Sequence, residues 1–521
     1  MTMSTRGTRP TTTTNKMGKV PSYNEMSRFL RRDLPNRVDV TAPLANRKTK
    51  IICTIGPSCQ SVDLVSQLLK AGMNVARLNF SHGSYKYHAE TIKNVREAAA
   101  ATGIPVAIML DTKGPEIRTL KLKGGKPFML NEGKELRIFC TSDREYEGDA
   151  AKIGIDYLNL PKAVKIGTII RIADGLINLK VIDVQSDEVT TIVQNTAEMG
   201  ENKGVNLPGC NVDLPSLSEK DIADLKFGVE QGVDFIAASF ARSGQGVDDI
   251  RDVLGPKGSH IKIISKIESE QGLNNFEEIL AKSDGIMVAR GDMGVEIPIQ
   301  KVCMAQKRMI RGCNAVGKPV VTATQMLESM IVNPRPTRAE ATDVANAVFD
   351  GSDCVMLSGE TAKGSFPVEA VSVMAKICAT AELAIDHENV FDNILTQTAK
   401  PLSRAEAIAS SAVKIDINLD AALIIVLTES GASARFVAKY RPSIPVISVT
   451  ADPIVYRQLL VTRAVWPLLV PSGKSDEEMI EDTIKYAVSQ KWAATDEWIV
   501  IVSGTQGIQG SAHTLKVVRV Q

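Results

Sequence analysis

Apolar residues along most of this chain form short runs that alternate with amphipathic stretches. After residue 48, each run is rich in Val, Ile and Ala and ends in polar or small residues. Runs of this kind are typical of strands buried on both faces, and stretches such as 61–69 and 87–99 have the periodicity of helices. The predicted strands are residues 51–55, 74–78, 106–110, 235–238, 261–264, 285–289, 320–323 and 354–357.

Eight strand–helix units in succession predict a (β/α)8 barrel of the α/β class over residues 47–114 and 217–395. The active site of such a barrel lies at the C-terminal ends of its strands. A doubly wound sheet is the competing architecture. Because the eight units are alike and polar motifs follow most of the strands, the pattern favours the barrel.

One interval, residues 115–216, interrupts the barrel after its third strand. Its runs are short, alternate between apolar and polar residues and are separated by turn residues, which predicts an all-β insertion. We expect a small β-barrel lid, hinged near residues 113–115 and at Pro215, that closes over the main barrel and excludes water. The predicted strands are residues 128–130, 134–139, 168–172, 176–182 and 189–193.

The two ends of the chain differ in character. Residues 1–46 form a polar extension that lacks the apolar core of a secretory signal. The first 20 residues contain basic residues and no acidic ones, so a transit peptide is the alternative interpretation. Residues 396–521 predict a separate α/β domain. Its expected helices are residues 405–415, 430–440, 454–460 and 477–490, and its expected strands are residues 422–427, 445–449, 498–502 and 515–520.

Composition narrows the classes of function. The 521 residues carry a net charge of +1, which gives no bulk attraction to nucleic acid or to an anionic membrane. No apolar run approaches the ~20 residues that cross a bilayer. Eight cysteines without a CxxC pair indicate reduced thiols, and we expect a cytoplasmic protein.

Ionisable residues follow the fifth and sixth predicted strands. Side chains of a strand alternate in direction, so Lys266 and Glu268 should point the same way, as should Arg290 and Asp292. In a parallel sheet two carboxylates and a lysine would then meet, which suits Mg²⁺ or Mn²⁺ and a phosphorylated or carboxylated substrate. The N–H of Gly291 could donate to a substrate carboxylate.

Three further side chains suit catalysis at this end of the barrel. Lys266 could neutralise charge on a transferring phosphoryl group; a Schiff-base lysine is the alternative, against which the adjacent carboxylates weigh. Taken alone, Thr324 and Ser358 are helix N-caps by preference. At the barrel mouth their hydroxyls could transfer a proton.

Oxygen-bearing side chains follow the second and third predicted strands. Arg77, Asn79 and Ser81 should share one face of strand two, and Asp111 and Thr112 follow strand three. Arg77 is a natural phosphate clamp. The oxygens, with one negative charge, suit a monovalent cation, although each residue taken singly fits a cap or a turn.

Two other places could bind phosphate groups. His82 and Arg118 border the route to the insertion and could contact a nucleotide. Residues 428–433 follow a strand and open a helix, where backbone N–H groups can hold a phosphate. An ordinary helix cap is the alternative there.

Several segments together closely resemble the pyruvate kinase family, in the family's order and over nearly everything after residue 48. They are Ile52-Cys-Thr-Ile-Gly-Pro-Ser58, Asn74-Val-Ala-Arg-Leu-Asn-Phe-Ser-His-Gly83, Leu110-Asp-Thr-Lys-Gly-Pro-Glu-Ile-Arg118, Lys203-Gly-Val-Asn-Leu-Pro-Gly209, Ile263-Ile-Ser-Lys-Ile-Glu268, Met287-Val-Ala-Arg-Gly-Asp-Met-Gly294, Ala323-Thr-Gln-Met-Leu-Glu-Ser-Met330 and Met356-Leu-Ser-Gly-Glu-Thr-Ala-Lys-Gly364.

The resemblance implies a (β/α)8 domain, an inserted β-barrel domain and a C-terminal effector domain, assembled as an allosteric homotetramer. The implied reaction moves the phosphoryl group of phosphoenolpyruvate to ADP, giving ATP and pyruvate, with Mg²⁺ and K⁺. The implied metal ligands are Glu268 and Asp292 for Mg²⁺, and Asn79, Ser81, Asp111 and Thr112 for K⁺. The resemblance also implies that Lys266 and Arg77 contact the phosphoryl group and that Gly291, Asp292 and Thr324 bind the substrate carboxylate. It implies that Thr324 and Ser358 take part in proton transfer. The implied nucleotide-binding residues are Asn79, His82, Arg118, Asp174 and Lys203.

The chain differs from the family pattern mainly in the effector domain. Glu116 occupies the position at which potassium-independent members tend to carry Lys, which implies that this protein depends on K⁺. In the lid, Ala173 replaces the commoner Asp, but the following Asp174 is kept. The loop 504–511 lacks the Trp and Arg of many members regulated by fructose 1,6-bisphosphate, and Glu429 adds negative charge, so we expect weak or absent activation by that sugar. A sugar monophosphate could use Thr428, Ser430, Gly431 and Ser433.

Two other functions fit parts of the pattern. A metal-dependent barrel lyase acting through pyruvate enolate would use the same carboxylates but would not need a nucleotide lid with Lys203. A metabolite-sensing scaffold without activity would show damaged catalytic positions, and the motifs contain none.

Overall fold

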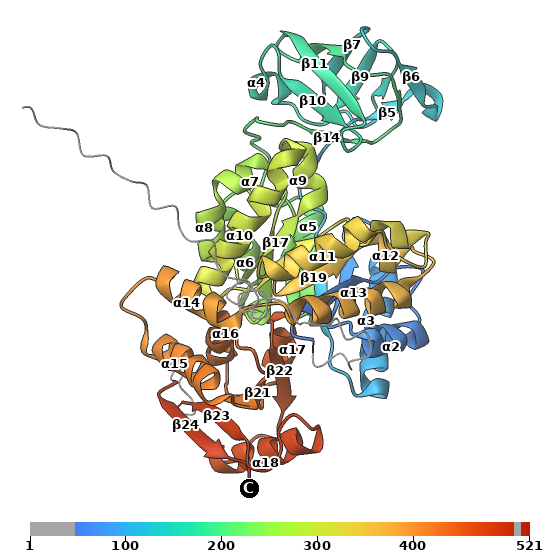
Figure 1. Ribbon diagram of the computed structural model, residues 1–521. Coiled ribbons are helices and arrows are strands. Elements are labelled where there is room, and N and C mark those ends of the chain that lie inside the picture. Colours follow the sequence, from blue (N-terminus) through green and yellow to red (C-terminus); the bar gives the residue numbers. More distant parts are fainter. Residues whose placement is uncertain (1–46, 505–511) are drawn as a thin grey trace, which may run out of the picture.

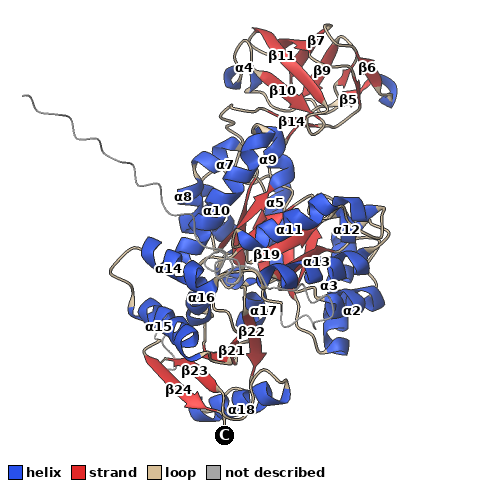
Figure 2. Cartoon of the chain, in the orientation of Figure 1, coloured by secondary structure: helices blue, strands red, loops and turns tan. Residues whose placement is uncertain are grey.

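The protein is described by a computed structural model over residues 47–504 and 512–521. Eight parallel strands close into a barrel in the order β1-β19-β18-β17-β16-β15-β3-β2 (Figures 1 and 2). The strands are β1 (Lys50–Thr54), β2 (Val75–Asn79), β3 (Ala107–Asp111), β15 (Phe235–Ala238), β16 (Lys262–Ile267), β17 (Gly285–Ala289), β18 (Val320–Ala323) and β19 (Cys354–Leu357). The predicted barrel is confirmed, and no predicted strand start differs from the observed one by more than one residue.

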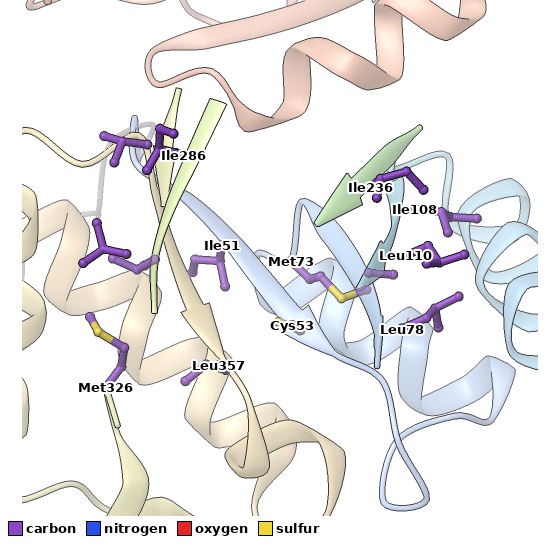
Figure 3. Close-up of a cluster of buried hydrophobic side chains, with 14 of the residues drawn as sticks. Ile51, Cys53, Met73, Leu78, Ile108, Leu110, Ile236, Ile286, Met326 and Leu357 are labelled. Atoms are coloured by element: carbon purple, nitrogen blue, oxygen red, sulfur yellow. The ribbon is translucent and has the colours of Figure 1, made fainter. Parts of the chain in front are cut away.

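Alternation along each barrel strand divides its side chains between two apolar cores. Ile51 and Cys53 pack outward against the helices, in the core partly drawn in Figure 3, whereas Ile52 between them fills the barrel interior. Both faces are buried, which explains why the strands are continuous apolar runs.

Helices cover the outside of the barrel, and several begin at polar caps. In α2, α3, α5, α6, α7 and α11 a preceding Ser or Thr side chain accepts a backbone N–H of the first turn. The helices are α2 (Val62–Ala71), α3 (Tyr85–Thr102), α5 (Glu219–Gln231), α6 (Gly244–Leu254), α7 (Glu270–Asn274), α8 (Phe276–Lys282), α9 (Arg290–Glu296), α10 (Val302–Val316), α11 (Arg338–Phe349), α12 (Gly359–Ala362) and α13 (Pro367–Glu382).

The insertion is an all-β unit with its own core, as predicted, and lies beyond one end of the barrel (Figure 1). Its main sheet has the order β4-β14-β10-β11-β12-β7-β9. The predicted strands correspond to β6 (Phe128–Leu130), β7 (Glu135–Cys140), β10 (Ile169–Ile172), β11 (Ile177–Val184) and β12 (Glu188–Val193). Not predicted were β4 (Ile117–Arg118), β5 (Lys121–Leu122), β8 (Glu147–Gly148), β9 (Lys152–Ile155), α4 (Leu160–Ala163), β13 (Ala197–Met199) and β14 (Gly204–Asn206).

The C-terminal α/β domain lies at the opposite end of the barrel (Figure 1). Its sheet has the order β22-β21-β20-β23-β24. Leu460 and Val461 of this domain belong to the core that fills the barrel interior. Its elements are α14 (His387–Gln397), α15 (Arg404–Leu419), β20 (Leu423–Leu427), α16 (Ala432–Lys439), β21 (Val446–Thr450), α17 (Pro453–Gln458), β22 (Val465–Leu469), α18 (Asp476–Ser489), β23 (Trp498–Ser503) and β24 (Thr514–Arg519).

Helix α14 crosses the predicted domain boundary at residue 395, and its Phe391 packs in the C-terminal core. The exact residues at which the predicted domains begin and end therefore remain predictions. The extension 1–46 and most of the loop 504–511 lie outside the described residues. Within the described ranges, no helix combines the length and the apolar character that a membrane crossing requires.

Candidate active site

Lys266 points into the barrel mouth from the C-terminal end of β16, and its side chain is only 10% exposed. Its Nζ lies 3.1 Å from Asp111 Oδ1 and 3.2 Å from Glu268 Oε1, and donates to Ser239 Oγ at 2.7 Å. Burial by itself lowers the pKa of Lys266, but Asp111 and Glu268 outweigh burial and raise it. A lysine held as a cation is a poor Schiff-base nucleophile, which weighs against that alternative.

Asp111 ends β3 and connects Lys266 to Arg77. Its Oδ2 accepts from Arg77 Nε at 2.6 Å, while Arg77 Nη1 donates to Thr54 Oγ1 at 2.7 Å. Burial tends to raise the pKa of Asp111, but the two neighbouring cations lower it below its usual value. The arginine and the lysine are thus fixed side by side around one ionised carboxylate.

Glu268 follows β16, is 1% exposed, and accepts from Phe240 N–H at 2.6 Å. Its contact with Lys266 confirms that the two side chains point the same way. Burial raises the pKa of Glu268, and the carboxylate of Asp292 raises it further. Two carboxylates that repel each other beside a lysine are the donor set expected for a hard divalent cation.

The predicted alignment of Arg290 with Asp292 is wrong. Strand β17 ends at Ala289 and α9 begins at Arg290, so the two side chains leave a helix in different directions. Arg290 instead donates at 2.7 Å to both Asp343 Oδ1 and Thr324 O. Asp292 lies in the first turn of α9, and its carboxylate is still near enough to help raise the pKa of Lys266.

Thr324 follows β18 in an unusual backbone conformation. Its φ is 70°, a left-handed value that a β-branched residue rarely adopts. Its Oγ1 donates to Ala323 O at 2.6 Å and accepts from Gly291 N–H at 2.7 Å. Thr324 is therefore not an ordinary helix cap, and strain of this kind is typical of functional sites.

Ser358 directly precedes α12, but its hydroxyl does not cap that helix. Instead Glu360 Oε2 accepts from Ser358 N–H at 2.7 Å, and within the described chain the buried Ser358 Oγ has no hydrogen-bond partner. A buried hydroxyl without a partner costs free energy unless a ligand or water satisfies it. Ser358 is thus available to a bound molecule.

The predicted cation ligands are only partly brought together. Asn79 pairs in register with Asp111 across β2 and β3, and Thr112 Oγ1 accepts from Ser239 N–H at 3.2 Å. Strand β2 ends at Asn79, so the predicted placement of Ser81 on its face is wrong. Ser81 is exposed in the following turn, where its N–H donates to Asn79 Oδ1 at 3.0 Å.

A cavity of about 390 Å³ lies between the lid and the barrel. It is lined by Arg118, Asp174 and Lys203 from the lid and by Asp292 from α9. Three of the predicted nucleotide residues therefore face one metal-ligand candidate. His82 is exposed and does not line this cavity.

The lid contacts α9 directly. Asn206 Nδ2 donates to Glu296 Oε1 at 2.7 Å, and Arg171 Nη1 donates to Val295 O. Helix α9 carries Asp292, so the lid and the carboxylate site meet on one element.

Ser239 and Phe240, which follow β15, belong to the site but were not predicted from the sequence. Ser239 Oγ donates to Thr112 O at 2.6 Å, and Phe240 has a left-handed φ of 52° that aims its N–H at Glu268. The sequence feature that could have identified Ser239 is its place as a polar residue directly after a predicted strand.

The predicted phosphate loop of the C-terminal domain precedes α16. Gly431 has φ 77° and donates to Thr428 Oγ1 at 2.9 Å, Ser433 is 8% exposed, and Arg435 Nη2 donates to Ser430 O at 3.2 Å. The Gly431 N–H is used within the loop, and Thr428 N–H donates to Val449 O of β21 at 3.0 Å, so the geometry fits an ordinary helix start as well as an anion site.

Comparison with known proteins matches both parts of this architecture. The family model of the pyruvate kinase barrel domain matches residues 46–371, and that of the pyruvate kinase alpha/beta domain matches residues 406–518. A pyruvate kinase from Dictyostelium discoideum is 53% identical over 480 residues, 91% of this chain and 94% of that protein. The pyruvate kinase PKLR of Rattus norvegicus is 48% identical over 494 residues, 92% of this chain and 86% of that protein.

A solved structure extends the match to three dimensions. The crystal structure of a pyruvate kinase from Cryptosporidium parvum superposes with a TM-score of 0.88 at 47% identity, covering 92% of this chain and 97% of that one. Both the barrel and the C-terminal domain are therefore matched in sequence, and their arrangement is matched in structure. The chain belongs to the pyruvate kinase family of phosphotransferases.

Proposed function

We propose that the enzyme transfers the phosphoryl group of phosphoenolpyruvate to ADP, giving ATP and pyruvate, and that Lys266 and Arg77 contact the phosphoryl group and stabilise its charge during the transfer. The observation that carries this proposal is the fixed pair of cations around Asp111, next to the carboxylates of Glu268 and Asp292. Positive charge at such a site stabilises charge that develops on a transferring phosphoryl group.

Glu268 and Asp292 would hold Mg²⁺ or Mn²⁺. The donor set fits, because the buried Glu268 and the half-buried Asp292 repel each other beside one lysine and prefer a further cation. When bound, the ion would neutralise phosphoryl and carboxylate charge. Gly291 N–H and Thr324 would orient the substrate carboxylate, and the unpartnered Ser358 hydroxyl with Thr324 would pass a proton to the enolate.

The lid side of the cavity would bind the nucleotide. Arg118, Asp174 and Lys203 line it, and the nucleotide would extend beyond the cavity to Asn79 and His82 of the barrel. A lyase acting through pyruvate enolate has no need of such a surface.

The test compares Lys266→Ala with Lys262→Ala in a pyruvate-coupled assay, with and without ADP. Lys262 begins the same strand and pairs with Asp284 at 3.7 Å, away from the mouth. We expect turnover to require ADP, and to fall by about 10³-fold in Lys266→Ala but not in Lys262→Ala. Pyruvate formation without ADP, or near-normal turnover of Lys266→Ala, would refute the proposal.

We propose that K⁺ binds near Asn79, Ser81, Asp111 and Thr112 and that Glu116 makes the enzyme depend on it. Glu116 Oε2 accepts from Arg118 Nε at 2.8 Å and lies 3.8 Å from Lys113. A lysine at position 116 would place a fixed cation in this region. Initial rates of Glu116→Lys should vary little when K⁺ is replaced by tetramethylammonium, and an undiminished K⁺ requirement would contradict this.

We propose that a sugar monophosphate, rather than fructose 1,6-bisphosphate, regulates the enzyme through Thr428, Ser430, Gly431 and Ser433. We also propose that the chain forms a homotetramer and that this homotetramer is located in the cytoplasm. Relatives from Glycine max and Arabidopsis thaliana carry the name cytosolic isozyme, which supports the location. Initial rates against phosphoenolpyruvate with sugar phosphates added singly test the effector. Strong activation by the bisphosphate would overturn it.

A further inference from the structure

The turn that connects β2 to α3, residues 80–83, carries two of the proposed ligand contacts. Ser81 and His82 are both exposed on this turn. Its first residue is tied to the barrel, because Phe80 N–H donates to Asp111 O at 2.9 Å. An exposed turn needs further contacts with the body of the protein if its binding groups are to keep one position.

His88 supplies such contacts from beneath the turn. It is the fourth residue of α3, after the N-cap Ser84, and side chains of a helix incline toward its N-terminus. The imidazole therefore reaches back past the cap, where Nε2 lies 2.8 Å from His82 O. The ring also stacks on Phe80, with the ring centres 4.0 Å apart and the planes at 12°. One side chain, 3% exposed, thus contacts two residues of the turn.

The hydrogen bond fixes which nitrogen of His88 carries the hydrogen. A carbonyl oxygen only accepts, so Nε2 is the donor and Nδ1 carries no hydrogen. Nδ1 is buried without a hydrogen-bond partner among the described residues, so a proton there would find no acceptor. Burial, helped by Lys220, lowers the pKa of His88 below its ordinary value, although the His82 carbonyl and Asp224 act in the other direction. His88 is therefore a neutral donor of one hydrogen bond at neutral pH.

Gly83 lets the turn lie close to the imidazole. Its φ is 80°, and a Cβ at this position would lie 3.2 Å from His88 Nε2 and 3.0 Å from Tyr87 Cδ1. A side chain here would strain the backbone and push the turn away from the ring. The close contact between turn and imidazole therefore depends on residues from both sides.

We propose that His88 is a positioning residue, which holds the turn 80–83 so that Ser81 and His82 stay in place for the cation and the nucleotide. The inference rests on the proposed function, which assigns K⁺ and the nucleotide to this part of the barrel. His88 donates to the turn and not to Lys266 or Glu268. Binding of ADP and K⁺ should therefore depend on His88 more than binding of phosphoenolpyruvate does.

Steady-state kinetics of two substitutions test the hydrogen bond. His88→Phe keeps an aromatic ring for the stack on Phe80 but removes the N–H donor, whereas His88→Gln keeps a neutral N–H donor on a side chain of similar reach. His88→Phe should raise KM for ADP, and the K⁺ concentration at half-maximal rate, by about fivefold each. KM for phosphoenolpyruvate at saturating K⁺ should change by less than about twofold. His88→Gln should bring both raised constants back toward the wild-type values.

Two further variants separate positioning from a general loss of stability. Thr91→Val is the matched control on the same helix, because its hydroxyl is 1% exposed and donates to Tyr87 O at 2.9 Å instead of to the turn. It should leave all three constants unchanged. Gly83→Ala displaces the turn with His88 left in place, so it should raise the same two constants and tests the contact even where His88→Phe does not fold.

The outcomes distinguish this inference from the proposed reaction. In a wild type that requires ADP and K⁺, unchanged constants in His88→Phe, or in Gly83→Ala where His88→Phe does not fold, would overturn the inference alone. The same conclusion would follow from equal changes in Thr91→Val, from no recovery in His88→Gln, or from an equal rise in KM for phosphoenolpyruvate. Pyruvate formation by the wild type without ADP would refute the proposed reaction, and this inference with it.

Discussion

Ser239 holds the ammonium group of Lys266 in place at the C-terminal end of β16. Its Oγ accepts from Lys266 Nζ at 2.7 Å and donates to Thr112 O at 2.6 Å, so its orientation is set by the backbone after β3. A hydrogen bond to a charged group contributes about 1.5–3 kcal/mol. Ser239 is therefore a positioning residue that acts through Lys266.

Ser239→Ala should lower kcat by about tenfold or more, because the ammonium group loses one of its three neighbours. KM for phosphoenolpyruvate should change much less. Ser265→Ala is the matched control. Ser265 lies next to Lys266 on β16, and its buried hydroxyl pairs with Ser283 Oγ at 2.7 Å instead of with the lysine. Equal kcat values for the two variants would show that Ser239 does not position Lys266.

At the scale of elements, β1 links the barrel to the C-terminal domain through Lys50. Its Nζ donates to Val465 O at 2.6 Å and lies 4.6 Å from the ring centre of Trp466. The pKa of Lys50 is lowered from 10.5 to about 7, mainly by burial and also by Arg47 and Arg463, while Cys354 and Glu382 oppose the shift. Strand β1 thus begins with a lysine that loses its charge far more easily in the folded chain.

Between pH 7 and 10.5 the unfolded chain binds the Lys50 proton and the folded chain does not, so raising pH stabilises the fold through this group. The free energy of unfolding of the wild type, relative to Lys50→Met, should rise by up to about 1.4 kcal/mol per pH unit above pH 7. Urea titrations of both proteins at pH 7, 8 and 9 measure the difference. A difference independent of pH would show that Lys50 titrates normally.

At the scale of the whole molecule, a buried ion pair between Arg441 and Asp353 joins the C-terminal domain to the barrel. Arg441 Nη1 donates to Asp353 Oδ1 at 2.6 Å, and both side chains are 6% exposed. Asp353 lies directly before β19 and also accepts from Val320 N–H at 3.1 Å. Removing the arginine leaves a carboxylate buried between two domains.

Arg441→Met should lower the free energy of unfolding by about 3–5 kcal/mol, because breaking a buried pair strands one charge. Urea denaturation followed by fluorescence measures the change. Lys474→Met, which breaks the exposed pair with Asp482, should leave stability unchanged. Similar losses in the two variants would mean that the Arg441–Asp353 pair does not join the domains.

The pattern of the sequence predicted elements well wherever local rules decide them. Barrel strands are buried on both faces and form apolar runs, so the residue at which each strand begins was predicted to within one residue. Strand β22 was missed because Pro467 interrupts it, and an edge strand tolerates such a proline. Arg290 was placed on a strand because nothing local shows that the backbone turns helical there.

What the sequence determined by itself is the succession of elements and the residue types at the strand ends, because hydrophobic periodicity and turn chemistry act over a few neighbours. Only the tertiary structure decided which charges share a site. Lys266 and Asp111 are 155 residues apart, and Arg441 and Asp353 are 88 apart. Their pairing depends on barrel closure and domain packing, and burial at those contacts sets both the pKa values and the energy of each pair.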